Sequence, residues 1–275
     1  MPRRFDTTAY RYPNEQLILG VTLALVFLVI VLTATATLCL SGVFILGMVA
    51  LSFWFSRSHH QELIRGAQRV TRATAPDLAS VAEECVTMIQ TGPVEVFVAP
   101  SKVLNAYTFG LSSPNVVVIH SPVLRVMDAD EVRFILGHEL GHVRLGHTWL
   151  NSLVGGMAGI PSPFVASAIL QFAFLWWNRA CEYSADRAGL LACGDLNKAV
   201  SALVKLEAGP RVRSRADLEQ AMRRIDAEDD HALSGLAESL GTHPMTINRI
   251  EALHRYAQSP AYQRLRAGML GNLDG

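Results

Sequence analysis

Charged residues are scarce in this chain of 275 residues: Asp, Glu, Lys and Arg make up 17% of it, which is low for a soluble protein. The 24 basic residues equal the 24 acidic ones in number, so nothing favours a nucleic-acid partner. The four cysteines form no C-x-x-C pair, and we interpret them as packing thiols of a reducing compartment, not as metal ligands. Internal repeats and any signal for an oligomeric state are also absent. Nucleic-acid binders, disulfide scaffolds and repeat proteins are therefore disfavoured.

Much of the missing charge falls in one N-terminal stretch, since residues 16–56 contain none. A single helix of that length would measure about 60 Å, twice the hydrocarbon core of a bilayer. We therefore predict an N-terminal transmembrane helical hairpin, residues 1–57, with spans at about 17–34 and 38–55. Arginines at positions 3, 4 and 11 precede the pair, and others at 57, 65, 69 and 72 follow it. Positive residues on both sides place both ends in the cytoplasm. The lipid bilayer is thus a predicted partner, in a multi-pass protein of the cell inner membrane whose active site faces the cytoplasm.

A cleaved signal peptide is the alternative, with Ala34-Thr35-Ala36 as its processing site. We disfavour it because the apolar run continues for about 18 further residues, the length that a second span needs. A second uncharged stretch covers residues 148–178, and Pro161 and Pro163 divide it into halves too short to cross a bilayer. It is either an apolar hairpin that dips into one leaflet or a helical pair buried in the soluble core.

The stretch "GHELGHVRLGH", residues 137–147, carries the strongest chemical signal. His138 and His142 are four residues apart and share one helix face, with Glu139 beside them. His-Glu-x-x-His is the zinc-metalloprotease signature, two imidazole ligands and a general base. His147 lies about half a turn round from His138 and is expected to face away, if the helix persists to the end of the motif.

A catalytic zinc site needs a third protein ligand. The metzincin pattern fails here, because Leu145 and Thr148 occupy its two extra positions. The segment "CEYSADRAGL", residues 181–190, offers a glutamate instead. We assign Glu182 as the ligand and Asp186, four residues on, as the group that orients a ligand histidine through its distal N–H.

Small residues predict that these two helices pack closely. Gly141 weakens its own helix, which suggests close approach of another backbone or of the substrate. Ala185 and Gly189 are small on the second helix. Asp128 as N-cap, with Glu131 three residues on, marks the start of the first helix.

A small sheet is predicted ahead of the histidine-bearing helix. Residues 75–90 have a helical pattern, and 94–100, 104–110 and 115–120 are typical of short strands. Such a sheet could bind an extended peptide by main-chain hydrogen bonds along an exposed edge. The segment from Asn105 to Gly110 is our candidate for that edge.

Four segments together resemble the membrane-bound zinc metallopeptidases of the HtpX and CAAX-prenyl-protease type: "NAYTFG", "GHELGHVRLGH", "EYSADRAG" and "THPMTINRIEAL". They occur in that family's order and span most of residues 93–253. The resemblance implies an α+β fold, a mainly α-helical gluzincin-type metallopeptidase domain with a small sheet behind the membrane hairpin. We expect a zinc metallopeptidase core at 58–194, including the apolar stretch, and a helical C-terminal part at 195–275 that completes the active site.

The resemblance also implies roles for individual residues. It implies one Zn²⁺ per chain, held by residues matching His138, His142 and Glu182, with Glu139 as the base. It implies that the edge strand lines the cleft, so the expected substrate-binding residues are Asn105, Ala106, Tyr107 and Gly110.

Two further catalytic candidates lie in "GTHPMTINRIEAL", residues 241–253. Pro244 suits the first position of a helix, which makes His243 the N-cap and a candidate donor to the oxyanion of the tetrahedral intermediate. Arg249 on the same helix is a candidate either to bind the oxyanion or to fix a carboxylate of the site. The resemblance supports both, since a His-Pro followed by an Arg looks like the family's transition-state-binding segment.

The leading hypothesis is a zinc-dependent integral-membrane endopeptidase that acts on membrane-associated or misfolded protein or peptide substrates. One alternative is a processing protease for a specific peptide, including a lipidated one. An intramembrane protease is disfavoured because the flanks of the histidine-bearing helix are too charged for a spanning segment. A catalytically silent membrane scaffold is disfavoured by the intact ligands and base.

Overall fold

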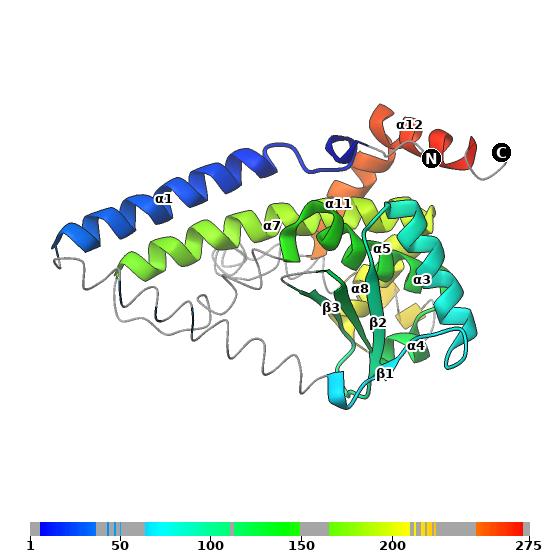
Figure 1. The fold of residues 1–275 in the computed structure, drawn as a ribbon. Helices are drawn as coiled ribbons and strands as arrows, with labels where there is room; N and C mark the ends of the chain where they lie inside the picture. Colours follow the sequence, from blue (N-terminus) through cyan, green and yellow to red (C-terminus); the bar gives the residue numbers. More distant parts are fainter. Residues whose placement is uncertain are drawn as a thin grey trace.

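The computed structural model describes residues 6–36, 64–110, 113–148, 165–209 and 246–271, with single positions between 43 and 50 and between 212 and 223. The described chain is mainly helical with one small mixed sheet, as predicted (Figure 1). Its elements are η1 (Thr7–Ala9), α1 (Glu15–Ala36), β1 (Gln68–Arg69), α3 (Pro76–Ile89), β2 (Val94–Ala99), β3 (Ala106–Phe109), β4 (Asn115–His120), α4 (Ser121–Val126), α5 (Ala129–Leu145), α7 (Val165–Cys193), α8 (Leu196–Ala208), α11 (Thr246–Ala257) and α12 (Pro260–Gly271).

The sheet has the strand order β1-β2-β4-β3. Strands β2 and β4 run parallel, whereas β1 and β3 pair antiparallel to β2 and β4 respectively. Three residues of β4, Val117, Val118 and Ile119, are fully buried, as expected for a strand covered on both faces. The three predicted strands are confirmed, and the two-residue β1 was not predicted. Strand β3 lies at the edge of the sheet.

Helix α5 begins at a reciprocal cap. The Asp128 side chain accepts hydrogen bonds from the backbone N–H groups of Asp130 and Glu131, while Glu131 accepts one from the N–H of Asp128. This is the capping box that the sequence predicts. The helix ends at Gly146, whose φ of 80° gives the left-handed conformation that glycine adopts at helix C-termini.

Helices α5 and α7 pack closely through small residues. A Cβ added at Gly141 would lie 2.7 Å from the Ala188 Cβ and 3.2 Å from the Ala185 Cα. A Cβ at Gly137 would lie 2.4 Å from the Ala192 Cβ. The close approach of a second backbone at Gly141 is therefore confirmed. It brings Glu182 on α7 towards the two histidines of α5.

Helix α1 lies along α7 and extends well beyond the sheet (Figure 1). The contact buries Ile18 against Phe174, Trp177 and their neighbours. Most of α1 has no such cover: Phe27 is 69% and Leu17 65% exposed. Within the described residues, 15–35 form the one helix long and apolar enough to cross a membrane.

The remaining membrane predictions fall largely on residues that are not described. The second predicted span, 38–55, lies outside the described residues except for single positions. Of the apolar stretch 148–178, residues 149–164 also lie outside them. The part from Val165 onward belongs to α7, which continues as one helix to Cys193. This apolar part packs on α1 through Phe174 and Trp177.

Candidate metal centre

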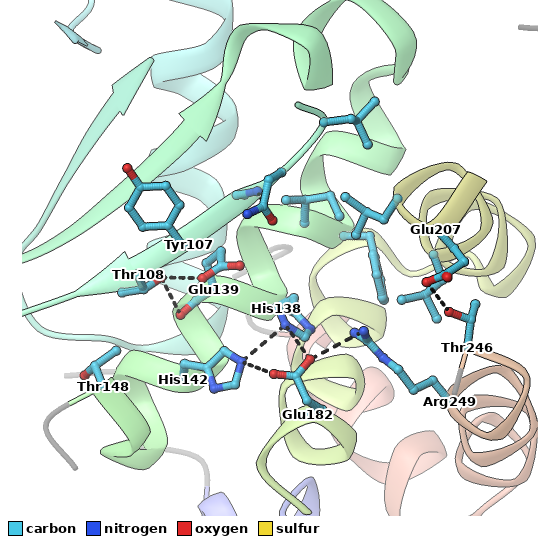
Figure 2. A pocket seen from close by; sticks show the side chains of 17 residues that line it. Tyr107, Thr108, His138, Glu139, His142, Thr148, Glu182, Glu207, Thr246 and Arg249 are labelled. Atoms are coloured by element: carbon cyan, nitrogen blue, oxygen red, sulfur yellow. Dashed lines mark hydrogen bonds and ion pairs between the residues drawn. The ribbon is translucent and has the colours of Figure 1, made fainter. Parts of the chain in front are cut away.

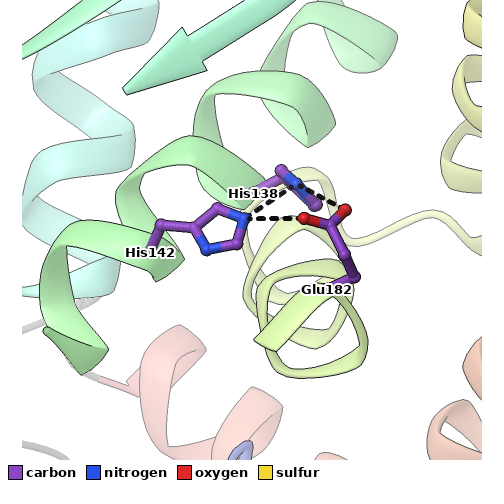
Figure 3. Close-up of side chains that lie close together, drawn as sticks. All are labelled: His138, His142 and Glu182. Atoms are coloured by element: carbon purple, nitrogen blue, oxygen red, sulfur yellow. Dashed lines mark hydrogen bonds and ion pairs between the residues drawn. The ribbon is translucent and has the colours of Figure 1, made fainter. Parts of the chain in front are cut away.

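Three candidate ligands come together from two helices. His138 and His142, one turn apart on α5, turn their Nε2 atoms towards the Glu182 carboxylate on α7 (Figure 3). The two Nε2 atoms are 3.2 Å apart. His138 Nε2 lies 3.6 Å from Glu182 Oε2, and His142 Nε2 lies 3.5 Å from Glu182 Oε1. All three residues are at most 9% exposed.

The donor set fits a zinc ion. Nitrogen and oxygen ligands at about 2.0–2.1 Å in a tetrahedral arrangement lie about 3.3 Å from one another. The separations of 3.2 to 3.6 Å are close to that value. Two imidazoles and one carboxylate also leave a fourth position for water, as catalytic zinc sites do.

Asp186 and Arg249 lie directly behind two of these ligands. Asp186 Oδ1 is 3.0 Å from His138 Nδ1, so its carboxylate accepts the distal N–H and leaves Nε2 for a metal. Arg249, on α11, donates to both oxygens of Asp186 at 2.8 and 2.6 Å, and its Nη1 is 3.4 Å from Glu182 Oε2. Burial alone would raise the pKa of Asp186, but the Arg249 guanidinium and His138 outweigh it and hold the pKa below its ordinary value.

His147 does not face away, because the condition for that expectation, a helix that persists through Gly146, is not met. Because α5 ends at Gly146, the chain turns and brings His147 Nδ1 to 3.0 Å from His142 Nδ1. Its Nε2 lies 3.2 Å from Glu15 Oε1, at the start of α1. Burial lowers the pKa of His147 to about 4 despite the nearby Glu15 carboxylate, so the imidazole is neutral at physiological pH.

Glu139 lies on α5 beside the ligands, and a residue of the edge strand holds it. Thr108 Oγ donates a hydrogen bond to Glu139 Oε2 at 2.6 Å (Figure 2). Both residues line a cavity of about 320 Å³ that also contains the three candidate ligands and Arg249.

The walls of this cavity differ in character. Asn105, Ala106 and Tyr107 line it from the edge strand, but Gly110 is not among its lining residues. Apolar side chains from α5 and α8 line another part: Phe134, Ile135, Leu203 and Leu206. Residue His243 lies outside the described residues.

Thr108, His147 and Glu15 were not among the predicted site residues. Thr108 lies within the predicted edge strand, and its position between Tyr107 and Phe109 gave no chemical signal. His147 could have been found by treating Gly146 as a helix C-cap. Glu15 is the last charged residue before the uncharged run, and nothing in its local sequence connects it to a residue more than 130 positions away.

Comparison with known proteins identifies a peptidase family and several relatives. The model of peptidase family M48 matches residues 72–257. The chain is 26% identical to the plastoglobule-localized metallopeptidase 48 of Arabidopsis thaliana, over 71% of this chain and 61% of that relative. It is 26% identical to a protease HtpX homolog of Ralstonia nicotianae, over 81% and 88% of the two chains. A protease HtpX homolog of Pyrococcus furiosus is 25% identical over 75% and 82%. The predicted resemblance to HtpX-type zinc metallopeptidases is thus confirmed.

Proposed function

The chain belongs to peptidase family M48, and from that premise we propose that it is an integral-membrane zinc endopeptidase. It hydrolyses peptide bonds in membrane-associated or misfolded proteins at the cytoplasmic face. The observation that carries the proposal is the buried donor set of His138, His142 and Glu182, which shares one cavity with Glu139 and an edge strand.

One zinc ion per chain would be held by His138, His142 and Glu182. When bound, zinc supplies a Lewis acid that polarises the scissile carbonyl and lowers the pKa of water to about 7. Glu139 accepts a proton from the attacking water and passes it to the leaving amine. The hydrogen bond from Thr108 holds one carboxylate oxygen of Glu139 and leaves the other to accept from the water.

The substrate would bind in extended form along β3. Asn105, Ala106 and Tyr107 line the cavity from this strand, which is an edge of the sheet. Main-chain pairing with an edge strand gives affinity with little sequence selectivity, which suits a protease of misfolded proteins. An apolar substrate side chain would bind against the apolar wall of the cavity, which is formed by Phe134, Ile135, Leu203 and Leu206.

We propose different roles for His243 and Arg249. We keep His243 as the proposed donor to the oxyanion, although it lies outside the described residues. For Arg249, its contacts with Asp186 and Glu182 support the role of fixing carboxylates of the site. Arg249 is then a positioning residue that acts through the metal ligands.

Membrane insertion begins at α1. Only 11% of the span at residues 15–35 is buried within the protein, which argues against a core helix of a soluble domain. A second span at 38–55 would return the chain to the side of the catalytic domain and give the cytoplasmic topology. The proposed parts are the hairpin at 1–57, the core at 58–194 and the C-terminal part at 195–275.

Three variants of the detergent-solubilised chain test the enzyme proposal. Glu139→Gln should retain about one zinc per chain by metal analysis and lose casein cleavage. Glu182→Ala should lose both. Glu251→Gln, an exposed carboxylate on α11, is the matched control and should keep both. Wild-type protein that holds zinc but shows no chelator-sensitive cleavage of casein would favour the silent scaffold instead.

A further inference from the structure

We propose that His147 and Glu15 are positioning residues of the metal centre, and that the first turn of the apolar helix α1 is thereby part of that centre. The inference rests on the proposed function, because it takes His142 as a ligand. It goes beyond it, because it assigns a metal-site role to the residue at which the membrane helix begins.

A continuous line of hydrogen bonds connects His142 to Glu15. His142 Nδ1 and His147 Nδ1 are 3.0 Å apart, and His147 Nε2 lies 3.2 Å from Glu15 Oε1. His142 is 9% exposed, His147 2% and Glu15 1%, so water competes little for these contacts. The His147 and Trp177 rings also pack in a T-shaped arrangement, which restricts the orientation of the imidazole.

The chemistry of the two ends fixes the direction of every hydrogen bond in this line. A metal on His142 Nε2 leaves the ring proton on Nδ1, which must donate. His147 Nδ1 must then accept, so the proton of the neutral His147 ring lies on Nε2 and is donated to Glu15. A carboxylate only accepts, and it therefore selects this tautomer. A carboxylate behind a ligand histidine fixes its ring and increases its basicity, and here one further imidazole transmits that effect.

Glu15 is held in place by hydrogen bonds that involve its own N-terminal segment and helix α7. Arg11 and the Ser184 hydroxyl both donate to its carboxylate, and Ser184 is two residues from Glu182 on α7. The backbone N–H of Tyr12 donates to the same hydroxyl at 2.7 Å, and Arg187 donates to the carbonyl of Arg11 at 2.9 Å.

An acidic residue in the first turn of a helix is ordinarily a surface feature that favours the helix dipole. Glu15 differs because it is buried and its carboxylate contacts residues far away in sequence. A buried carboxylate is unfavourable unless it is paired and hydrogen-bonded, so a role limited to the dipole does not account for its position.

The test is the zinc dissociation constant of the full chain in detergent, measured by competition with a chromogenic chelator. Glu15→Ala and His147→Phe should each weaken zinc binding about 10- to 100-fold, the usual effect of losing a partner of a ligand histidine. The double variant should be no weaker than the worse single one, because both act through the same His142 proton. Glu15→Gln keeps an oxygen that accepts from His147 and should recover most of the loss.

Tyr256→Phe is the matched control. It removes a hydroxyl that donates to the Ala9 carbonyl at 3.4 Å and so loosens the same N-terminal segment outside the hydrogen-bonded line. Its zinc affinity should stay within about two-fold of wild type. The absorption bands of the cobalt-loaded protein should change in Glu15→Ala and His147→Phe but not in this control.

The outcomes separate two failures. A wild-type chain that binds no zinc refutes the proposed function itself. If wild type binds zinc, the inference is overturned by single variants within about three-fold of it, by additive losses in the double variant, or by a Glu15→Gln protein as impaired as Glu15→Ala. Should Glu15→Ala not fold, the His147→Phe and Glu15→Gln proteins provide the same comparison.

Discussion

Replacing Gly141 by alanine tests whether the close contact of α5 and α7 sets the geometry of the metal centre. The new Cβ would lie 2.7 Å from the Ala188 Cβ, whereas carbon atoms in contact are about 3.5–4.0 Å apart. The helices must therefore separate locally by about 1 Å, while metal–ligand distances tolerate only about 0.2 Å. Overpacking costs about 1–3 kcal/mol, and the better helix propensity of alanine returns at most about 1 kcal/mol. We expect a lower melting temperature and a zinc dissociation constant at least about ten-fold higher.

Two further variants make this prediction specific to the helix contact. Gly20→Ala is the same substitution within α1, where a Cβ meets nothing within 4 Å, and it should leave zinc binding unchanged. Adding Ala188→Gly to Gly141→Ala removes the closer of the two contacts and leaves the one with the Ala185 Cα at 3.2 Å, so it should recover part of the lost zinc affinity. Chelator competition and differential scanning fluorimetry measure both properties. The reasoning is refuted if Gly141→Ala binds zinc like wild type, or if the second substitution restores nothing.

Three other predictions concern Thr108, Asp186 and His243. Thr108→Val should lower kcat about ten-fold with KM and bound zinc unchanged, whereas Thr108→Ser keeps the hydroxyl and should have a kcat near that of wild type. A Thr108→Val protein with the kcat of wild type would remove Thr108 from the mechanism. Asp186→Asn should destabilise the metal-free protein at neutral pH, and its difference in melting temperature from wild type should narrow as the pH falls below 3.8, the ordinary pKa of the carboxyl group. The reason is that the lowered pKa of Asp186 contributes stability that is fully present above pH 3.8 and is lost as the pH falls through the lowered pKa. A difference that widens in acid would contradict this. His243→Ala should lower kcat by about 10²–10³ with little change in KM or zinc, and a kcat within a few-fold of wild type would leave His243 as a helix cap.

Much of the fold and of the ligand geometry followed from local patterns. The capping box at Asp128, the alternating strands and the four-residue spacing of His138 and His142 are each decided within a few residues of chain. Small residues on both α5 and α7 predicted the close contact, because only they allow two backbones to approach in this way. These features depend on local residue patterns or on the size of a side chain, and both can be read directly from the sequence.

The parts that escaped prediction depend on where a helix ends and on what meets across the fold. A continuous helix through Gly146 would turn His147 away from His142, and one residue in the left-handed region reverses that outcome. Thr108 meets Glu139 only because the edge strand crosses α5 there. Glu15 meets His147 only because α1 lies along α7. Such meetings are set by tertiary packing, for which neither residue carries a local signal.

The position of Glu15 relates the depth of the metal centre to the proposed membrane span. Residues 16–56 contain no charge, so on the proposed topology Glu15 marks the point where α1 enters the bilayer. Two hydrogen bonds of about 3 Å and two imidazole rings separate its carboxylate from His142 Nε2, a path of about 10 Å. An extended chain advances about 3.3 Å per residue, so a separation no longer than that path corresponds to at most about three residues of substrate. A membrane protein lying beside α1 would therefore present to Glu139 the residues just outside its own span. The site would select substrates by their distance from the bilayer more than by their side chains, which agrees with binding through the main chain of an edge strand.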